Sequence, residues 1–183
     1  MTTNSAQQTL TSSDLGAIHT IVDQLLGETC WQAKFSYGDE LTLHFGDRVS
    51  YAQSSMANLE KGSWILGTRG TNWQLSRASN CIVNSDATPE IMREKVRQIE
   101  GLALTALDIN YPSLGLTLTF GERLQLSILP CLADDEYELP YWELFTPEQY
   151  VLKVGARLNW SYTSNSPDNF KSPTVECGFQ HHH

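Results

Sequence analysis

The feature that most constrains this chain is a near-repeat. Residues 40–48 read ELTLHFGDR and residues 115–123 read GLTLTFGER; VDQLLG at 22–27 matches VRQIEG at 96–101, WIL at 64–66 matches WEL at 142–144, and Tyr37 matches Tyr111. The offset is 74 residues at the glycines, 75 at the phenylalanines and 78 at the tryptophans. Such slow drift is typical of one unit used twice, with insertions in its loops. Chance similarity of alternating strands is the alternative, but it does not explain the shared order.

Each copy begins with a helical pattern. Ser12, Ser13 and Asp14 precede apolar residues at 3.6-residue spacing that end at Gly27, and Thr88-Pro89 opens a second helix that ends at Gly101. Alternating segments after each glycine predict strands. The sequence therefore predicts an α+β fold of two tandem related units packed together, each a helix followed by a mainly antiparallel sheet of about four strands. The expected bounds are 12–85 and 86–163, followed by an irregular tail and tag remnant at 164–183.

The charge balance bears on partners and compartment. A formal charge of −9, with only 12 Lys and Arg, argues against direct binding of nucleic acid and suits a basic protein partner, although acidity can also serve solubility alone. The four cysteines are too far apart for a zinc or redox pair, so free thiols are expected, with a long-range disulfide as the alternative. Neither a membrane span nor a signal peptide is evident, which predicts a cytoplasmic protein without a membrane partner.

The sequence offers little for catalysis. Outside the terminal His181–His183, the chain has only His19 and His44, and their positions do not suggest a base beside a nucleophile. No phosphate-binding loop, dinucleotide fingerprint, nucleophile elbow or zinc-protease motif is present. Carboxylate-pair catalysis needs no local motif and stays open. We expect no enzyme, no catalytic residue, no metal and no cofactor.

The segment 130–141 is the best candidate for recognition. It concentrates carboxylates around an aromatic residue between two prolines, in the place that residues 51–62 occupy in the first unit. Aromatic side chains can anchor an interface while carboxylates steer a basic partner. A solvated acidic loop is the plain alternative, and a calcium site is disfavoured because the ligand spacing of an EF-hand is missing. The predicted partner-binding residues are Asp134, Asp135, Glu136, Tyr137, Glu138 and Tyr141.

Two resemblances bear on function. The Trp142-Glu143-Leu144 strand, with Pro147, Leu152, Gly155 and Trp160 after it, resembles small bacterial β-rich proteins of uncertain function that carry a Trp-x-Leu strand. In size, acidity and lack of catalytic motifs, the chain is also similar to the immunity proteins of bacterial toxin–antitoxin competition, such as contact-dependent growth inhibition. That likeness implies a cytoplasmic protein that occludes the active site of one cognate toxin, often a basic nuclease. It carries over no functional residue.

The expected function is therefore protein binding, with neutralisation of a cognate toxin as its specific form. The alternatives are a small-molecule-binding module, which a ligand-dependent rise in melting temperature would reveal, and a non-catalytic structural subunit, which would form a stable homo-oligomer. The sequence does not specify the oligomeric state.

Overall fold

The computed structural model describes residues 4–9, 11–36, 40–131 and 138–166. Within these residues the helices are short: α1 (Leu15–Val22) and α2 (Pro89–Val96), with three 3-10 turns, η1 (Asp23–Leu25), η2 (Ser54–Met56) and η3 (Arg97–Ile99). The strands are β1 (Asn4–Thr9), β2 (Thr29–Phe35), β3 (Leu41–Ser50), β4 (Glu60–Thr68), β5 (Asn72–Arg77), β6 (Asn80–Asn84), β7 (Leu102–Ile109), β8 (Leu116–Phe120), β9 (Leu124–Leu129), β10 (Trp142–Phe145), β11 (Tyr150–Val154) and β12 (Asn159–Ser164).

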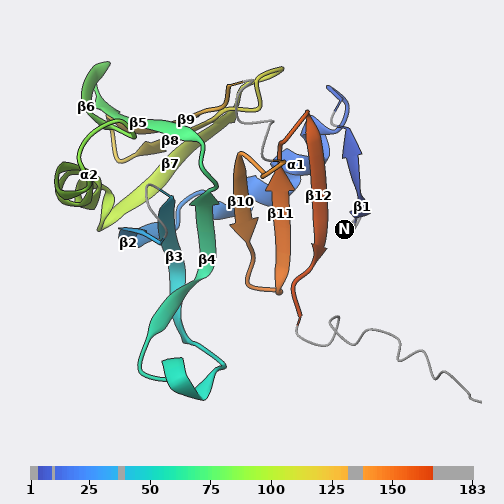
Figure 1. The fold of residues 1–183 in the computed structure, drawn as a ribbon, viewed down its shortest axis with the longest axis horizontal. Coiled ribbons are helices and arrows are strands. Elements are labelled where there is room, and N and C mark those ends of the chain that lie inside the picture. Colours follow the sequence, from blue (N-terminus) through green and yellow to red (C-terminus); the bar gives the residue numbers. More distant parts are fainter. Residues whose placement is uncertain (1–3, 10, 37–39, 132–137, 167–183) are drawn as a thin grey trace, which may run out of the picture.

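The predicted fold class is wrong. The described strands form one antiparallel sheet in the order β1-β12-β11-β10-β4-β3-β2-β7-β8-β9-β5-β6, and the chain is mostly β rather than two tandem helix-plus-sheet units (Figure 1). Strands β5 and β6 leave the first half of the chain, β5 pairing with β9 and β6 with β5, whereas β10 leaves the second half and pairs with β4. Neither half therefore has a sheet of its own.

The joint between the two halves lies where β2 meets β7. These strands share only two residue pairs, Thr29 with Ala103 and Cys30 with Leu102. The hydrogen bonds around the joint are reciprocal: the Gly27 N–H donates to the Leu104 carbonyl at 2.8 Å, and the Gly101 N–H donates to the Cys30 carbonyl at 2.7 Å. Because 27 and 30 lie 74 residues before 101 and 104, the matched segments occupy equivalent positions across the joint.

Both glycines at the joint have left-handed backbone, with φ of +86° at Gly27 and +85° at Gly101, a conformation that glycine adopts without steric cost. The matched phenylalanines meet across the core, because the Phe45 and Phe120 rings stack with centroids 6.1 Å apart and an interplanar angle of 11°. The sheet thus folds over itself, and β3 and β8 contribute to the same buried core.

The tryptophan match needs a correction. Trp64 lies in β4 and Trp142 in β10, and these two strands pair directly with each other, Leu66 opposite Leu144. By strand order, the counterpart of β10 is β5, where Trp73-Gln74-Leu75 has the same Trp-x-Leu pattern. Both Trp73 and Trp142 are buried, as inward-facing anchors should be.

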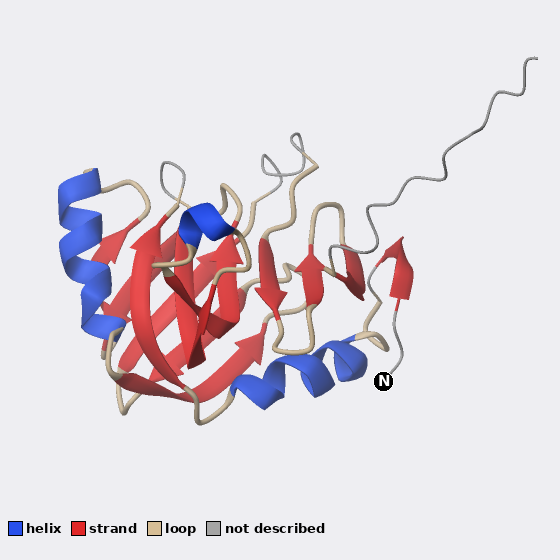
Figure 2. Cartoon of the chain, turned by 90° about the horizontal axis from the view of Figure 1, so that it is seen from below, coloured by secondary structure: helices blue, strands red, loops and turns tan. Residues whose placement is uncertain are grey.

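The helices cover the sheet at separate places (Figure 2). Each buries one stripe of its surface, Ile18, Ile21 and Val22 from α1 and Met92 and Val96 from α2. Helix α2 begins at Pro89, as predicted, and contacts β6 and β2. None of the helices among the described residues has the length and apolar character needed to cross a bilayer.

A long hairpin extends from the body of the molecule. Strands β3 and β4 continue past the core, and the turn η2 sits at the tip of this extension (Figure 1). The register shifts between Phe45 and Arg48, and from Arg48 to Ser50 all β3 side chains are exposed. We call residues 48–61 the arm.

Candidate functional site

The acidic segment predicted for recognition lies mostly outside the described residues. Asp134, Asp135, Glu136 and Tyr137 belong to residues 132–137, of which nothing is described. Glu138 is exposed, and its Oε1 lies 3.3 Å from Nη1 of Arg157.

Tyr141 takes a different place from the one expected. Its side chain is only 4% exposed, and its ring packs on Gly155, where an added Cβ would collide with the ring. The Tyr141 carbonyl accepts a hydrogen bond from the Thr71 hydroxyl at 2.9 Å. Tyr141 therefore contributes to the core, and its ring is not an exposed anchor. The contact role of the rest of the segment stays a prediction.

A different surface has the features of a binding site. A hollow of about 580 Å³ lies between β2 and the α2–η3 helical segment. Five consecutive residues of β2 form one wall, and the arm contributes Arg48. We call this hollow the β2 groove; its lining residues are Trp31, Gln32, Ala33, Lys34, Phe35, Arg48, Arg93, Arg97 and Glu100.

The β2 groove is basic on an acidic chain. It is lined by four of the chain's 12 Lys and Arg but by only one of its 21 Asp and Glu. That carboxylate, Glu100, is already engaged: its Oε1 accepts the Ala33 N–H at 3.2 Å, and its Oε2 lies 3.6 Å from Nε of Arg97. Local potential depends on the arrangement of charges rather than on their sum, so this groove attracts anions although the chain is acidic.

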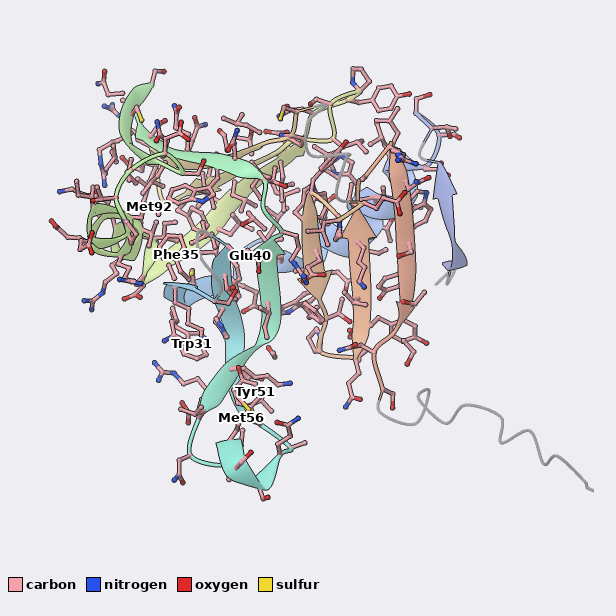
Figure 3. All side chains as sticks on the ribbon, in the orientation of Figure 1. Trp31, Phe35, Glu40, Tyr51, Met56 and Met92 are labelled. Atoms are coloured by element: carbon pink, nitrogen blue, oxygen red, sulfur yellow. The ribbon has the colours of Figure 1, made fainter. Side chains whose placement is uncertain are left out.

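Trp31 forms a ridge between the β2 groove and a second hollow. The Arg48 guanidinium lies over its ring, 4.4 Å from the centroid, a cation–π contact that fixes both side chains. The second hollow, of about 330 Å³, is lined partly by Tyr51, Met56 and Leu59 of the arm. Figure 3 shows Trp31, Tyr51 and Met56 along this side of the molecule. An aromatic ridge with arginine and exposed apolar side chains is typical of a protein-binding surface.

His44 supports this ridge from within the core. It is 1% exposed, its ring lies 5.4 Å from that of Trp31, and its Nδ1 accepts the Gly62 N–H at 2.9 Å. Burial, with Lys34 and Lys61 nearby, lowers its pKa to about 4. The histidine is therefore neutral at pH 7 and is occupied in holding β3 to β4.

Three features of the described residues bear on metal binding and on reactive side chains. These residues contain no group of three or more His, Cys, Asp or Glu placed to hold a metal. Burial raises the pKa of the Cys30 thiol to about 12, so this cysteine is a weak nucleophile. Arg69, Glu40 and Glu143 line another small hollow and form ion pairs with one another, with Nη1 of Arg69 3.2 Å from Glu143 and Nε 3.4 Å from Glu40.

The sequence reasoning missed the β2 groove, although a signal was present. Within the matched blocks, Asp23 corresponds to Arg97, and His19 corresponds to Arg93. Both helical segments form in the structure although these charges differ. The basic residues of the second segment are therefore not needed for folding and are candidates for ligand binding. Comparison with known protein families, with characterised proteins and with solved structures finds no match to this chain.

Proposed function

We propose that this chain works by binding another protein through the surface around Trp31, which comprises the β2 groove and the second hollow beside it. In this way it neutralises a cognate bacterial toxin. Trp31 carries the proposal, because tryptophan and arginine dominate the binding energy of protein interfaces and here they are stacked beside two hollows. The arm adds contact area that projects away from the core.

The charge of the remaining surface supports a toxin as the partner. With four cations gathered in the β2 groove, the rest of the chain is more acidic than its total of −9 suggests. Such a surface speeds encounter with a basic nuclease domain, while the anchors slow dissociation. Occlusion of the nuclease's active site is the proposed mechanism; it uses no cofactor, nucleic acid or membrane.

A cytoplasmic site of action fits the cysteines. In the described part of the chain Cys30 and Cys81 are free thiols, and Cys30 is buried. Free thiols are the usual state in a reducing compartment. The proposal therefore places the chain where an incoming toxin would meet its substrate.

The test has two steps: the proposal predicts that a neighbouring gene encodes a toxin-like domain, and that domain is then used as the partner. We expect the chain to bind that domain and inhibit its nuclease activity, and Trp31→Ala to raise the Kd by at least about 30-fold, since loss of a hot spot costs ~2 kcal/mol or more. Lys153→Glu, an exposed change in β11, which β3, β4 and β10 separate from β2, is the control and should leave the Kd within about threefold under the same principle.

Two results would contradict the proposal. One is the absence of any complex or inhibition by the folded chain. The other is full inhibition by Trp31→Ala. If the chain instead melts at higher temperature with a small anion, or elutes as a stable homo-oligomer without the toxin domain, the alternative functions take its place.

A further inference from the structure

The wall of the β2 groove is an open sheet edge. On one side β2 pairs with β3 along its length, but on the other its pairing with β7 stops at Cys30. The Ser36 N–H donates to the Glu40 carbonyl, and antiparallel pairs alternate in hydrogen bonding, so the backbone groups of Lys34 face β3. Those of Ala33 and Phe35 therefore face the groove.

One of the backbone groups that face the groove, the Ala33 N–H, is bonded to a side-chain oxygen in the place where a neighbouring strand would supply a carbonyl oxygen. The Ala33 N–H donates to the Glu100 carboxylate rather than to a backbone carbonyl. The Phe35 N–H has no acceptor among the described residues. An edge with unpaired N–H and C=O groups is a template for an added strand, and natural proteins usually cover it or block it.

The cations of the groove stand beside this edge. Lys34 comes from β2 itself, Arg93 and Arg97 come from the helical segment opposite, and Arg48 comes from the arm. Lys34 and Arg93 have no ion-pair partner within the parts of the chain that the structure describes. Their charges are available to a ligand.

The other half of the chain supplies an internal comparison. Strand β7 has the same open edge beyond Ala103, since the Asn110 N–H donates to the Gly115 carbonyl and Leu107 and Ile109 thus face away from β8. Where β2 has Lys34, β7 has Asp108, and the matched helical segment α1–η1 has His19 and Asp23, 3.5 Å apart, in place of Arg93 and Arg97. The matched strand therefore alternates in the same way without a cation at this position.

We propose that the β2 groove binds an extended acidic segment of the partner protein, which adds to the sheet as a strand along Trp31–Phe35. Backbone hydrogen bonds to Ala33 and Phe35 provide the docking edge, and acidic side chains of the segment pair with Lys34, Arg93 and Arg97. The Glu100 carboxylate holds the Ala33 N–H until the segment replaces it. This inference rests on the proposed protein-binding function and names the chemistry of the segment bound.

The same cations could attract a nucleic acid, but the geometry favours a peptide. Phosphate oxygens accept hydrogen bonds from N–H groups but cannot donate to the C=O groups that alternate with them along the edge. A second strand pairs with both kinds of group. Single-stranded nucleic acid also binds through aromatic faces that are free to stack, and the Trp31 ring is covered by Arg48. Nucleic acid is accordingly an outcome that the test must separate.

The probe is a fluorescein-labelled peptide of four Glu-Val repeats, and the readout is fluorescence anisotropy with the full chain. We expect binding that weakens with salt and falls at least about tenfold in Arg93→Glu/Arg97→Glu, because that change reverses two contacts. Lys153→Glu/Arg157→Glu makes the same charge change at exposed residues in β11 and in the turn after it, away from the groove in the strand order, and should bind within about threefold of the unaltered chain. Glu100→Ala should bind more tightly, because it frees the Ala33 N–H and removes a like charge.

Two modified peptides test the strand itself. In one peptide every Glu nitrogen is methylated, and in the other every Val nitrogen is methylated. Because the N–H groups of alternate residues point to the same edge of a strand, only one of the two peptides retains the N–H groups that face β2. We expect one to bind like the parent and the other at least about tenfold more weakly. Equal binding of both, or equal binding by the Arg93/Arg97 variant and the unaltered chain, would overturn the proposal, as would an oligothymidylate that binds more tightly than the peptide and displaces it.

Failure here is distinguishable from failure of the proposed function, because the peptide titration contains no toxin. If the peptide does not bind but the toxin domain does, and Trp31→Ala weakens that complex, the groove ligand is wrong and the protein-binding function stands. If neither binds, both proposals are contradicted.

Discussion

At the scale of single residues, His44 shows how a polar side chain can be required by the core. Its Nδ1 accepts the Gly62 N–H, and Gly62 is itself confined, since an added Cβ would lie 2.6 Å from the carbonyl oxygens of Phe45 and Trp64. Alternation predicts that His44 lies on the outer strand face, opposite to Leu41, Leu43 and Phe45, where the second half has Thr119. The structure instead buries it below Trp31, where the ring helps to position the proposed anchor.

The buried histidine makes stability depend on pH. Its pKa is lowered to about 4 when folded and is near the ordinary 6.5 when unfolded, so between these values the unfolded chain binds the extra proton. The free energy of unfolding should therefore fall as pH drops from 6.5 towards 4, by up to about 3 kcal/mol from this group. Urea unfolding at a series of pH values measures it.

A variant isolates the histidine from the carboxylates that titrate in the same range. His44→Asn keeps an acceptor near the Gly62 N–H but cannot titrate, so its stability should decline less between pH 6.5 and 4.5. A His44→Asn slope equal to that of the unaltered chain would show that His44 does not carry this dependence.

At the scale of elements, the contact between β4 and β10 depends on a charge pair. Glu143 lies in the middle of the Trp-x-Leu strand, its side chain is 8% exposed, and Arg69 after β4 reaches it at 3.2 Å. Gln74, the corresponding residue of β5, is uncharged and bonds to Ser76 at 2.9 Å. The pairing geometry thus tolerates an amide at this position.

This comparison predicts a strong and reversible effect. Arg69→Met should cost about 3–5 kcal/mol of unfolding free energy, because it leaves the Glu143 carboxylate buried without its partner. Arg69→Met/Glu143→Gln should recover most of that loss, since the remaining partner, Glu40, is more exposed than Glu143. Chemical denaturation of the three proteins decides the matter; a loss below about 1 kcal/mol in the single variant would mean that water already screens Glu143.

At the scale of the whole molecule, the local features could be predicted from the sequence, but the pairing of strands between the two halves of the chain could not. The helix that starts at Pro89, the glycines that end each helical segment and the alternation along β8 follow from neighbouring residues, and the structure has them. The pairing of β5 with β9 and of β10 with β4 depends on partners far along the chain, which period-2 patterns do not identify. That is why two separate units were expected.

The β2 groove escaped prediction for the same reason. Its wall comes from residues 31–35 and its opposite side from residues 93–100, and only the crossing of the two halves brings these segments together. The acidic segment at 130–141 was favoured because its charges are adjacent in sequence, whereas the cations of the groove are dispersed along it. Tyr141 shows the opposite error, since an aromatic residue beside carboxylates became part of the core.

The most direct test of the account is amide hydrogen exchange along β2, followed by NMR in the free chain and with the Glu-Val peptide at saturation. In the free chain the Phe35 amide should exchange much faster than that of Lys34, which is bonded to β3. The peptide should slow Phe35 by at least about tenfold while Lys34 changes little. A Phe35 amide that is already slow in the free chain, or that exchanges at the same rate with the peptide bound, would contradict an open edge that accepts a partner's strand.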